Sequence, residues 1–203
     1  IQRLPQPGET IRMDAFSKAA GGKGANQAVA AARSGAKTSF IGRVGDDANA
    51  AFMRGELVKN QIDTQYVATT ADTETGQAYI LLQASGQNSI IIQHGANFEL
   101  TPADVQRATG LIQSADFVVA ELETPVAATA EAFKIAKAAG KVTILNPAPA
   151  QKELPEALLK NVDLIAPNET ESELITGIPV TDEASMRQSA AYYHQLGIRG
   201  VVI

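Results

Sequence analysis

The sequence predicts an α/β protein of the doubly wound type, with a mainly parallel sheet, helices on both faces and a small separate β-sheet. Three observations lead to this prediction. From about residue 37, short apolar and β-branched runs alternate with longer stretches of helical periodicity. The short runs are continuously apolar, which is typical of parallel strands covered on both faces. Two other stretches, 1–16 and 76–93, break this rhythm and have no room for a helix.

The alternating part is expected to begin with a strand that is followed directly by a helix. The run "TSFIGRV" at 38–44 predicts a strand, and the stretch 47–60 that follows predicts a helix. Asp46 and Asp47 are both available to cap this helix, because a side-chain carboxylate accepts hydrogen bonds from the first free backbone N–H groups. We interpret these two residues as candidate caps rather than as ligands, with one or the other capping the helix.

The second half of the chain repeats this alternation. "DFVVAEL" at 116–122 predicts a strand, and the next helix is expected to start at Thr124 as its cap, with Pro125 in its first turn and Gly140 at its end. The remaining expected elements are strands at "VTILN" and "DLIAP", a helix from Asn168, a helix near 182–196 and a terminal strand at "GVVI".

The stretch 76–93 predicts a β-hairpin. Its two apolar runs flank Ser85 and Gly86, a typical turn pair. The opening stretch is punctuated by Pro and Gly and partly alternates. We expect the two stretches together to form a small sheet that serves as a lid or an oligomer contact.

The composition excludes several classes of protein. The chain has 203 residues, 45% of them hydrophobic, and a formal net charge of −5, which argues against binding to nucleic acid or to anionic membranes. No run of 18 apolar residues predicts a membrane span. The absence of cysteine excludes disulfides and thiolate zinc sites and fits the cytoplasm, where we expect the protein to act. Because the chain starts at Ile1 without Met and stops in an apolar run, we expect it to be part of a longer protein.

Polar side chains follow three neighbouring strands of the predicted sheet. Glu121 and Glu123 end the first, Asn146 the second and Asn168 the third. Ligands of open parallel sheets bind beyond the carboxyl ends of the strands, so these side chains predict a polar floor for a hydroxylated or phosphorylated ligand. Each also has a purely structural interpretation: Glu123 as a carboxylate at a helix N-terminus, and Asn146 as a turn residue.

The run "NETE" at 168–171 has two interpretations as well. Asn168 and Glu171 have the spacing of a capping box, in which each side chain bonds to the backbone N–H of the other. The same spacing points an amide and a carboxylate at one spot, where they could orient Mg²⁺-bound water or phosphate oxygens.

The glycine-rich turn at 21–24 precedes an alanine-rich helix over 25–33 that ends at Gly35. The turn lacks the spacing of a P-loop, because Gly24 and Ala25 follow Lys23 where that motif needs Ser or Thr. It also lacks the third glycine of a dinucleotide-binding turn. The alanines predict a helix buried against close neighbours, and Asn26 in its first turn could bind a hydroxyl group.

The motif "GGKGANQAVAAARSGA" resembles the N-terminal signature of the ribokinase (PfkB-type) family of carbohydrate kinases. Seven further motifs match that family in order: "LPQPGET", "GRVGDD", "TG", "HGAN", "LETP", "NPAPA" and "PNETE". The resemblance implies a ribokinase-like α/β core over 17–73 and 98–203, with a β-sheet lid formed by 1–16 and 74–97. It also implies transfer of the γ-phosphate of ATP to the 5-hydroxyl of D-ribose, with Mg²⁺ and a monovalent cation such as K⁺.

The resemblance also assigns residues to the site. Those implied to contact or cover the sugar are Gly22, Lys23, Asn26, Ala78, Ile90 and Glu123. Asn168 is implied to lie near the nucleotide phosphates, and Glu171 near Mg²⁺, which it would reach through water. The resemblance further implies a homodimer formed through the lid.

The parts of the family pattern that carry catalysis are not in this sequence. The Asn-x-Asp motif of the first strand would precede Ile1, and the catalytic aspartate of G-A-G-D would follow Ile203. We therefore assign no catalytic residue within 1–203 and expect this chain alone to be inactive. Two alternatives stay open: a kinase for another sugar or a nucleoside, and a non-catalytic sugar-binding or assembly module.

Overall fold

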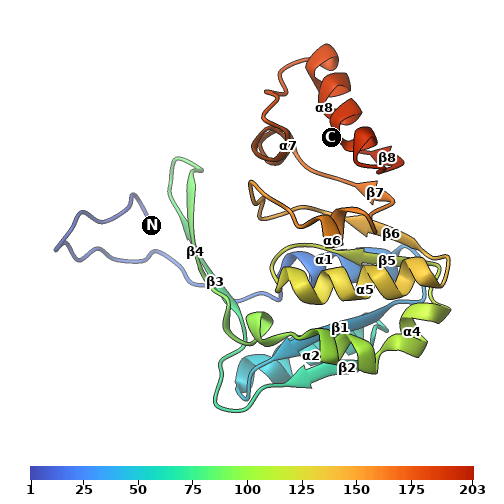
Figure 1. Cartoon of the computed structure of the whole chain (residues 1–203). Coiled ribbons are helices and arrows are strands. Elements are labelled where there is room, and N and C mark those ends of the chain that lie inside the picture. The colour runs from blue at the N-terminus through green and yellow to red at the C-terminus, as the bar shows by residue number, and fades with distance from the viewer.

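The computed structural model describes all 203 residues and alternates strands with helices, as the sequence predicts (Figure 1). The strands are β1 (Ser39–Val44), β2 (Asp63–Thr69), β3 (Gln77–Leu82), β4 (Asn88–Gln93), β5 (Phe117–Ala120), β6 (Val142–Leu145), β7 (Leu164–Ile165) and β8 (Gly200–Val201). The helices are α1 (Lys23–Arg33), α2 (Ala48–Lys59), the 3₁₀ helix η1 (Gly95–Glu99), α3 (Pro102–Arg107), α4 (Thr109–Ser114), α5 (Val126–Ala138), α6 (Glu156–Leu159), α7 (Glu169–Thr176) and α8 (Glu183–Gln195). None of these helices is long and apolar enough to cross a membrane.

The parallel strands form two sheets. β1 pairs with β2, and β5, β6, β7 and β8 pair in that order, every pair being parallel. The hairpin β3–β4 is antiparallel and forms a sheet of its own. The predicted α/β class is therefore confirmed, whereas the division of the parallel strands between two sheets was not predicted.

Three apolar clusters hold the parallel sheets and their helices together. One packs β1 and β2 against α1 and α2, and a second packs β6 and β7 against α5 and α8. The third lies between them: buried Val105, Ile112 and Ala128 are joined by Ile41 and Tyr66 from the first sheet and by Val118 from the second. This third cluster joins the two sheets into one body without a hydrogen bond between their strands.

Helix α1 is less buried than its alanines suggested. Only Ala28 is buried, while Ala25, Val29 and Ala32 pack partly against the first sheet. The other face of the helix is open, so the expectation of a helix buried against close neighbours holds for one face only. Small side chains permit close packing on one face, but they do not require a neighbour on the other.

The hairpin projects from the body with both faces exposed. Figure 1 shows it standing away from the sheets together with the N-terminal segment. Gly86 in its turn has a φ of 87°, as the Ser-Gly pair predicts. The opening stretch forms no strand; only Ile1 bonds to the hairpin, through the backbone of Leu82 and Ala84. The predicted sheet between the two segments is therefore reduced to this one contact, and the division of the chain into core and lid stays a prediction.

The outgoing leg of the hairpin is fixed to the body at Thr75, which is buried. The Thr75 hydroxyl donates to Asp47 Oδ1 at 2.6 Å and accepts from the Gly45 N–H at 3.0 Å, and the Thr75 N–H donates to Asp47 Oδ2 at 2.9 Å. The backbones pass so closely here that a Cβ on Gly45 would lie 2.1 Å from the Thr73 carbonyl oxygen. Of the two candidate caps, Asp47 caps α2 by accepting from the Ala50 N–H, and Asp46 does not cap it.

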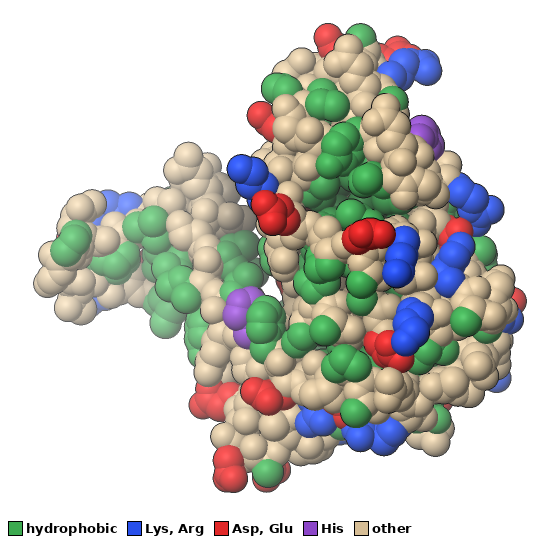
Figure 2. Space-filling view, viewed as in Figure 1, with side chains coloured by type: hydrophobic (Ala, Val, Ile, Leu, Met, Phe, Trp, Pro, Cys, Tyr) green, Lys and Arg blue, Asp and Glu red, His purple; other side chains and the backbone are tan.

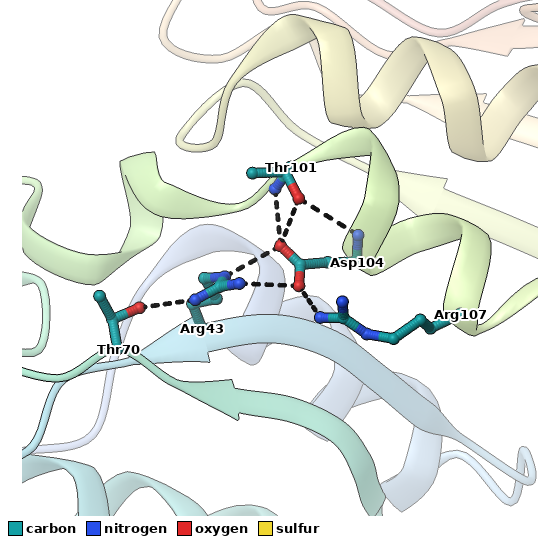
Figure 3. Close-up of polar contacts among 5 residues, drawn as sticks. All are labelled: Arg43, Thr70, Thr101, Asp104 and Arg107. Carbon is teal, nitrogen blue, oxygen red and sulfur yellow. Dashed lines mark hydrogen bonds and ion pairs between the residues drawn. The ribbon is translucent and has the colours of Figure 1, made fainter.

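The returning leg leads through η1 to α3, which an ion pair holds against β1 (Figure 3). Arg43 donates to both carboxylate oxygens of Asp104, at 2.9 and 2.8 Å, and to the Thr70 hydroxyl at 3.0 Å. Thr101 caps α3 in a capping box with the same carboxylate, and Arg107 also contacts it. The outgoing leg of the hairpin is thus fixed through Asp47, and α3, which follows the returning leg, is fixed through Asp104.

Some elements were mispredicted. β2, η1, α3, α4 and α6 were not predicted at all, although Thr101, Pro102 and Asp104 together carry a helix-start signal. Thr124 does not cap α5: Pro125 occupies the N-cap position, and no side chain bonds to the free N–H groups there. The helix over 182–196 and the helix from Asn168 are confirmed as α8 and α7.

Candidate functional site

The polar residues of the strand ends lie at one edge of the four-stranded sheet. Because β5, β6 and β7 are parallel neighbours, their carboxyl ends face the same way. Glu121 and Glu123 follow β5, Asn146 follows β6 and Asn168 follows β7. In Figure 1 the hairpin projects from the side of the body on which α1 and α7 begin. The structure therefore brings the predicted polar floor to one edge.

Glu123 meets the glycine turn, 100 residues away in the sequence. Glu123 Oε2 accepts a hydrogen bond from the Lys23 N–H at 2.9 Å. Gly22, with a φ of 93°, is the N-cap of α1, and a Cβ there would lie 3.9 Å from the same oxygen. A free N–H group and the positive end of the helix dipole favour a carboxylate at this point. One carboxylate oxygen is thereby fixed, and Oε1 is left free of protein partners.

Glu121 lies behind Glu123 and is buried, with 8% of its surface exposed. Its Oε2 accepts from the Glu123 N–H. Burial raises the pKa of Glu121 to about 7; the nearby Glu123 carboxylate adds to this rise, and the Glu123 N–H and the Lys23 ammonium oppose it. The sequence placed Glu121 at the strand end but did not indicate its burial; in the structure the first turn of α1 lies against it at Gly24.

Asn26 lies one turn into α1 with its side chain free of hydrogen bonds within the chain. Asn146 is differently placed. Its Nδ2 donates to the Ala166 carbonyl oxygen at 2.8 Å, which ties the end of β6 to the end of β7. Of the two amides, Asn26 therefore has no hydrogen bond within the chain, whereas the Asn146 amide already makes one.

Asn168 and Glu171 form the capping box that their spacing predicts. Asn168 Oδ1 accepts from the Glu171 N–H at 2.7 Å, and Glu171 Oε2 accepts from the Asn168 N–H at 2.9 Å. Glu171 Oε1 has no protein partner, so it can still hold a metal-bound water. No group of three or more His, Asp or Glu side chains is clustered in the chain as a metal-ligand set. This edge of the chain therefore carries one carboxylate oxygen without a protein partner and no cluster of metal ligands.

Ala78 and Ile90 lie on the same face of the hairpin. Ala78 is opposite Ile92, and Ile80 is opposite Ile90; residues opposite each other across an antiparallel pair share a face. The other face carries Tyr79, Leu81 and Ile91. Large hydrophobic side chains are exposed on both faces, and Figure 2 shows hydrophobic side chains gathered on this projecting part of the molecule.

Known carbohydrate kinases match this chain over almost its whole length. The sequence profile of the pfkB family carbohydrate kinases matches residues 2–203. A ribokinase of Staphylococcus aureus (strain COL) is 50% identical over 204 residues, which cover 100% of this chain and 67% of that protein. A deoxyribokinase of Salmonella typhi is 37% identical over 201 residues, covering 99% of this chain and 66% of that protein.

Solved structures agree with the sequence relatives. The structure of Arabidopsis thaliana ribokinase complexed with ribose and ATP superposes with a TM-score of 0.87 and 34% identity, covering 98% of this chain and 65% of that chain. The chain therefore spans about two thirds of the length of these relatives. The fold is ribokinase-like, and the chain belongs to the pfkB family of carbohydrate kinases.

Proposed function

We propose that the protein transfers the γ-phosphate of ATP to the 5-hydroxyl of D-ribose, giving ribose 5-phosphate. The observation that carries this proposal is the junction of Glu123 with the first turn of α1, at the edge where the parallel strands end. The junction offers a free carboxylate oxygen beside an amide without a partner, which suits a ligand with several hydroxyl groups. The named ribokinase relatives, and the neighbour solved with ribose and ATP, support this choice.

The residues of this chain act by binding and positioning the sugar. Gly22 keeps the backbone of the turn open to the ligand, and Lys23 stands beside it. Asn26 donates and accepts hydrogen bonds, and Glu123 accepts them from sugar hydroxyls. Holding the acceptor hydroxyl in line with the phosphate contributes most of the catalysis in phosphoryl transfer. Ala78 and Ile90 on one face of the hairpin would cover the sugar and exclude water, which competes as an acceptor.

The nucleotide side of the site would use Asn168 and Glu171, with Mg²⁺ reached through water by the free Oε1 of Glu171. Bound Mg²⁺ supplies positive charge to the phosphate oxygens. We also propose that the complete gene product uses a monovalent cation such as K⁺. The proton acceptor for the sugar hydroxyl is expected beyond Ile203, so residues 1–203 supply positioning and no catalytic base. We place the reaction in the cytoplasm. This compartment is reducing, and the fold has no disulfides that reduction would break.

The test is the variant Glu123→Ala in the complete gene product that carries this sequence. Because hydrogen bonds to a charged group contribute about 1.5–3 kcal/mol, the KM for ribose should rise roughly 10- to 150-fold, whereas the KM for ATP should stay within about twofold. Steady-state kinetics with each substrate varied in turn measures this split. Glu183→Ala is the control, because Glu183 forms only an exposed pair with Arg187. An unchanged ribose KM in Glu123→Ala would refute the assignment.

One comparison favours a second phosphate acceptor, 2-deoxyribose. The deoxyribokinase relative is 37% identical across nearly the whole chain. Ribose and 2-deoxyribose differ by one hydroxyl, and a site built to bond that hydroxyl rejects the analogue that lacks it. Measuring ADP release with ribose, 2-deoxyribose and a panel of nucleosides compares the acceptors directly. A kcat/KM for 2-deoxyribose above that for ribose would replace the proposed substrate.

A non-catalytic role is the remaining alternative. The same ADP-release assay on residues 1–203 alone and on the complete gene product separates it from the kinase. We expect activity from the complete gene product and none from the shorter chain. A complete gene product that binds ribose without releasing ADP would support a sugar-binding module instead.

A further inference from the structure

Glu121 is a buried carboxyl group beside the sugar-binding residues for which the proposed reaction has no role. It lies two residues before Glu123, at the end of β5, and only 8% of its surface is exposed. A carboxyl group that is buried without a cation in hydrogen-bond contact is costly, unless its position serves another purpose. Its contacts indicate that purpose.

The Glu121 carboxyl group fills the space between the loop that carries Glu123 and the first turn of α1. Its Oε2 accepts from the backbone N–H of Glu123, which fixes the start of the loop. Its Oε1 lies 3.0 Å from the point where a Cβ on Gly24 would stand, and the Phe40 ring lies 3.6 Å from the same point. Glu123 in turn accepts from the Lys23 N–H. The first turn of α1 and the loop therefore form one unit around two carboxyl groups.

The charges around Glu121 come from two of its neighbours. The loop contributes the Glu123 carboxylate, α1 contributes the Lys23 ammonium, and the Phe40 ring from β1 is uncharged. Burial is the larger effect and raises the pKa of Glu121 to about 7, with Glu123 acting in the same direction and Lys23 against it. Near neutral pH Glu121 is therefore present in both its neutral and its ionised form.

We propose that Glu121 is a positioning residue of the sugar site: its carboxyl group holds Glu123 against the start of α1, and sugar binds to the form in which Glu121 is neutral. The proposal rests on the proposed function, since it concerns the sugar affinity of the same residues. A sugar above Glu123 displaces the water that solvates the two carboxyl groups. Loss of that water disfavours the doubly charged form, because two like charges repel more strongly in a medium of low dielectric constant.

It follows that sugar binding above neutral pH takes up a proton at Glu121. The affinity for the sugar then falls as the pH rises past the pKa of the free site, by up to about tenfold per pH unit. The affinity for ATP has no such dependence from this source, because the nucleotide does not cover the two carboxyl groups.

The experiment compares the wild type with Glu121→Gln in the complete gene product. Glutamine keeps a side-chain oxygen to accept from the Glu123 N–H but cannot ionise. Between pH 6 and pH 8.5 we expect the ribose KM of the wild type to rise at least fivefold, and that of Glu121→Gln to stay within about twofold. The KM for ATP should follow the same profile in both proteins. A purely structural role for Glu121 would lower the amount of folded enzyme without removing the pH slope.

A second measurement uses unfolding of the complete gene product and needs no activity. The folded-state pKa of Glu121 lies above its ordinary value of 4.5, so its contribution to stability is full below pH 4.5 and is lost as the pH rises through about 7. The denaturation midpoint of the wild type should therefore fall relative to that of Glu121→Gln between pH 5 and pH 8.

The outcomes separate the two proposals. An enzyme that phosphorylates ribose with the same pH slope in both proteins overturns the role of Glu121 and leaves the proposed function in place. A flat wild-type profile, or a difference in unfolding midpoint that does not change with pH, overturns the role of Glu121 as well. A complete gene product that phosphorylates no sugar at all contradicts the proposed function itself.

Discussion

At the scale of single residues, the buried carboxyl groups differ in their partners more than in their burial. Asp104 and Asp163 are buried, and each accepts hydrogen bonds from two cationic side chains. For Asp163, hydrogen bonds from Lys137 and Thr143 outweigh burial, so its pKa is lowered. Glu121 has no cation in hydrogen-bond contact, and its pKa is raised. The partner therefore decides whether a buried acid stabilises the fold as an anion or remains partly neutral near pH 7.

We expect Asp104→Asn to destabilise the chain by about 2–4 kcal/mol, because the substitution leaves the Arg43 guanidinium without its carboxylate. Urea denaturation of the two proteins at pH 7 measures this loss. Arg107→Ala is the matched control, since Arg107 is exposed and its loss should cost no more than about 0.5 kcal/mol.

The acid dependence of stability gives a second check on Asp104. Although burial opposes it, the hydrogen bonds from Arg43 and Thr101 hold the pKa of Asp104 below its ordinary value of 3.8. A lowered folded-state pKa means that the stabilisation is present above pH 3.8 and is lost as the pH falls below it. The difference between wild type and Asp104→Asn should therefore shrink below pH 4. An equal difference at pH 7 and pH 3 would show that the charge of Asp104 is not what stabilises the fold.

At the scale of elements, α7 raises the question of whether Glu171 serves the helix, the metal or both. The capping box accounts for one oxygen of Glu171 and leaves the other free. A cap interaction is worth about 1 kcal/mol, which a denaturation experiment resolves. Glu171→Gln retains an oxygen that can cap, whereas Glu171→Ala retains none, so the pair of variants separates the two roles.

We expect Glu171→Ala to lower the melting temperature by a few degrees and Glu171→Gln to lower it less. If Glu171 also reaches Mg²⁺ through water, both variants should need several-fold more Mg²⁺ for half-maximal activity, because both lack the charge. A Mg²⁺ titration of each complete gene product measures this. Unaltered titrations in both variants would leave Glu171 as a cap alone.

The hairpin shows how an element depends on its anchoring. Two strands alone are marginally stable in water, and this pair exposes hydrophobic side chains on both faces. Its outgoing leg is fixed by the contact of Thr75 with Asp47, and the helix α3 that follows its returning leg is fixed by the pair of Asp104 with Arg43. These anchors orient the hairpin on the side where the sugar is proposed to bind, although none of the four residues is proposed to touch the sugar.

At the scale of the whole molecule, the exposed hairpin supports the proposal of a homodimer. If Ala78 and Ile90 face the sugar, the opposite face with Tyr79, Leu81 and Ile91 remains for a second copy. Exposed apolar patches of this kind mark interaction surfaces. Burying these patches in a dimer would also stabilise the hairpin, because its own two strands bury little apolar surface.

We expect Ile91→Lys to convert the dimer into a monomer, since a lysine charge would be buried at the contact. Sedimentation velocity of the complete gene product at several concentrations measures the oligomeric state. Leu174→Lys is the control, because Leu174 is also exposed but lies on α7, away from the hairpin. A wild type that sediments as a monomer, or an Ile91→Lys variant that still dimerises, would contradict this proposal.

The parts of the structure that were predictable from sequence are those with local causes. The strands β1, β5 and β6, the caps Asp47 and Asn168 and the hairpin turn at Gly86 follow from patterns within a few residues. α3 was missed although Thr101 and Asp104 mark its start, because it is too short for its periodicity to be seen. Thr124 was misassigned because Pro125 already occupies the N-cap position.

The sequence by itself determined the α/β class, the polar residues of the strand ends and the family, because hydrophobic periodicity and motif order are properties of the chain. Only the tertiary structure decided that the parallel strands form two sheets, that Glu123 reaches the Lys23 N–H and that Glu121 is buried behind it. These facts depend on contacts between segments up to 100 residues apart. Burial and charge at such contacts arise from packing, and packing is not encoded in any single stretch of the chain.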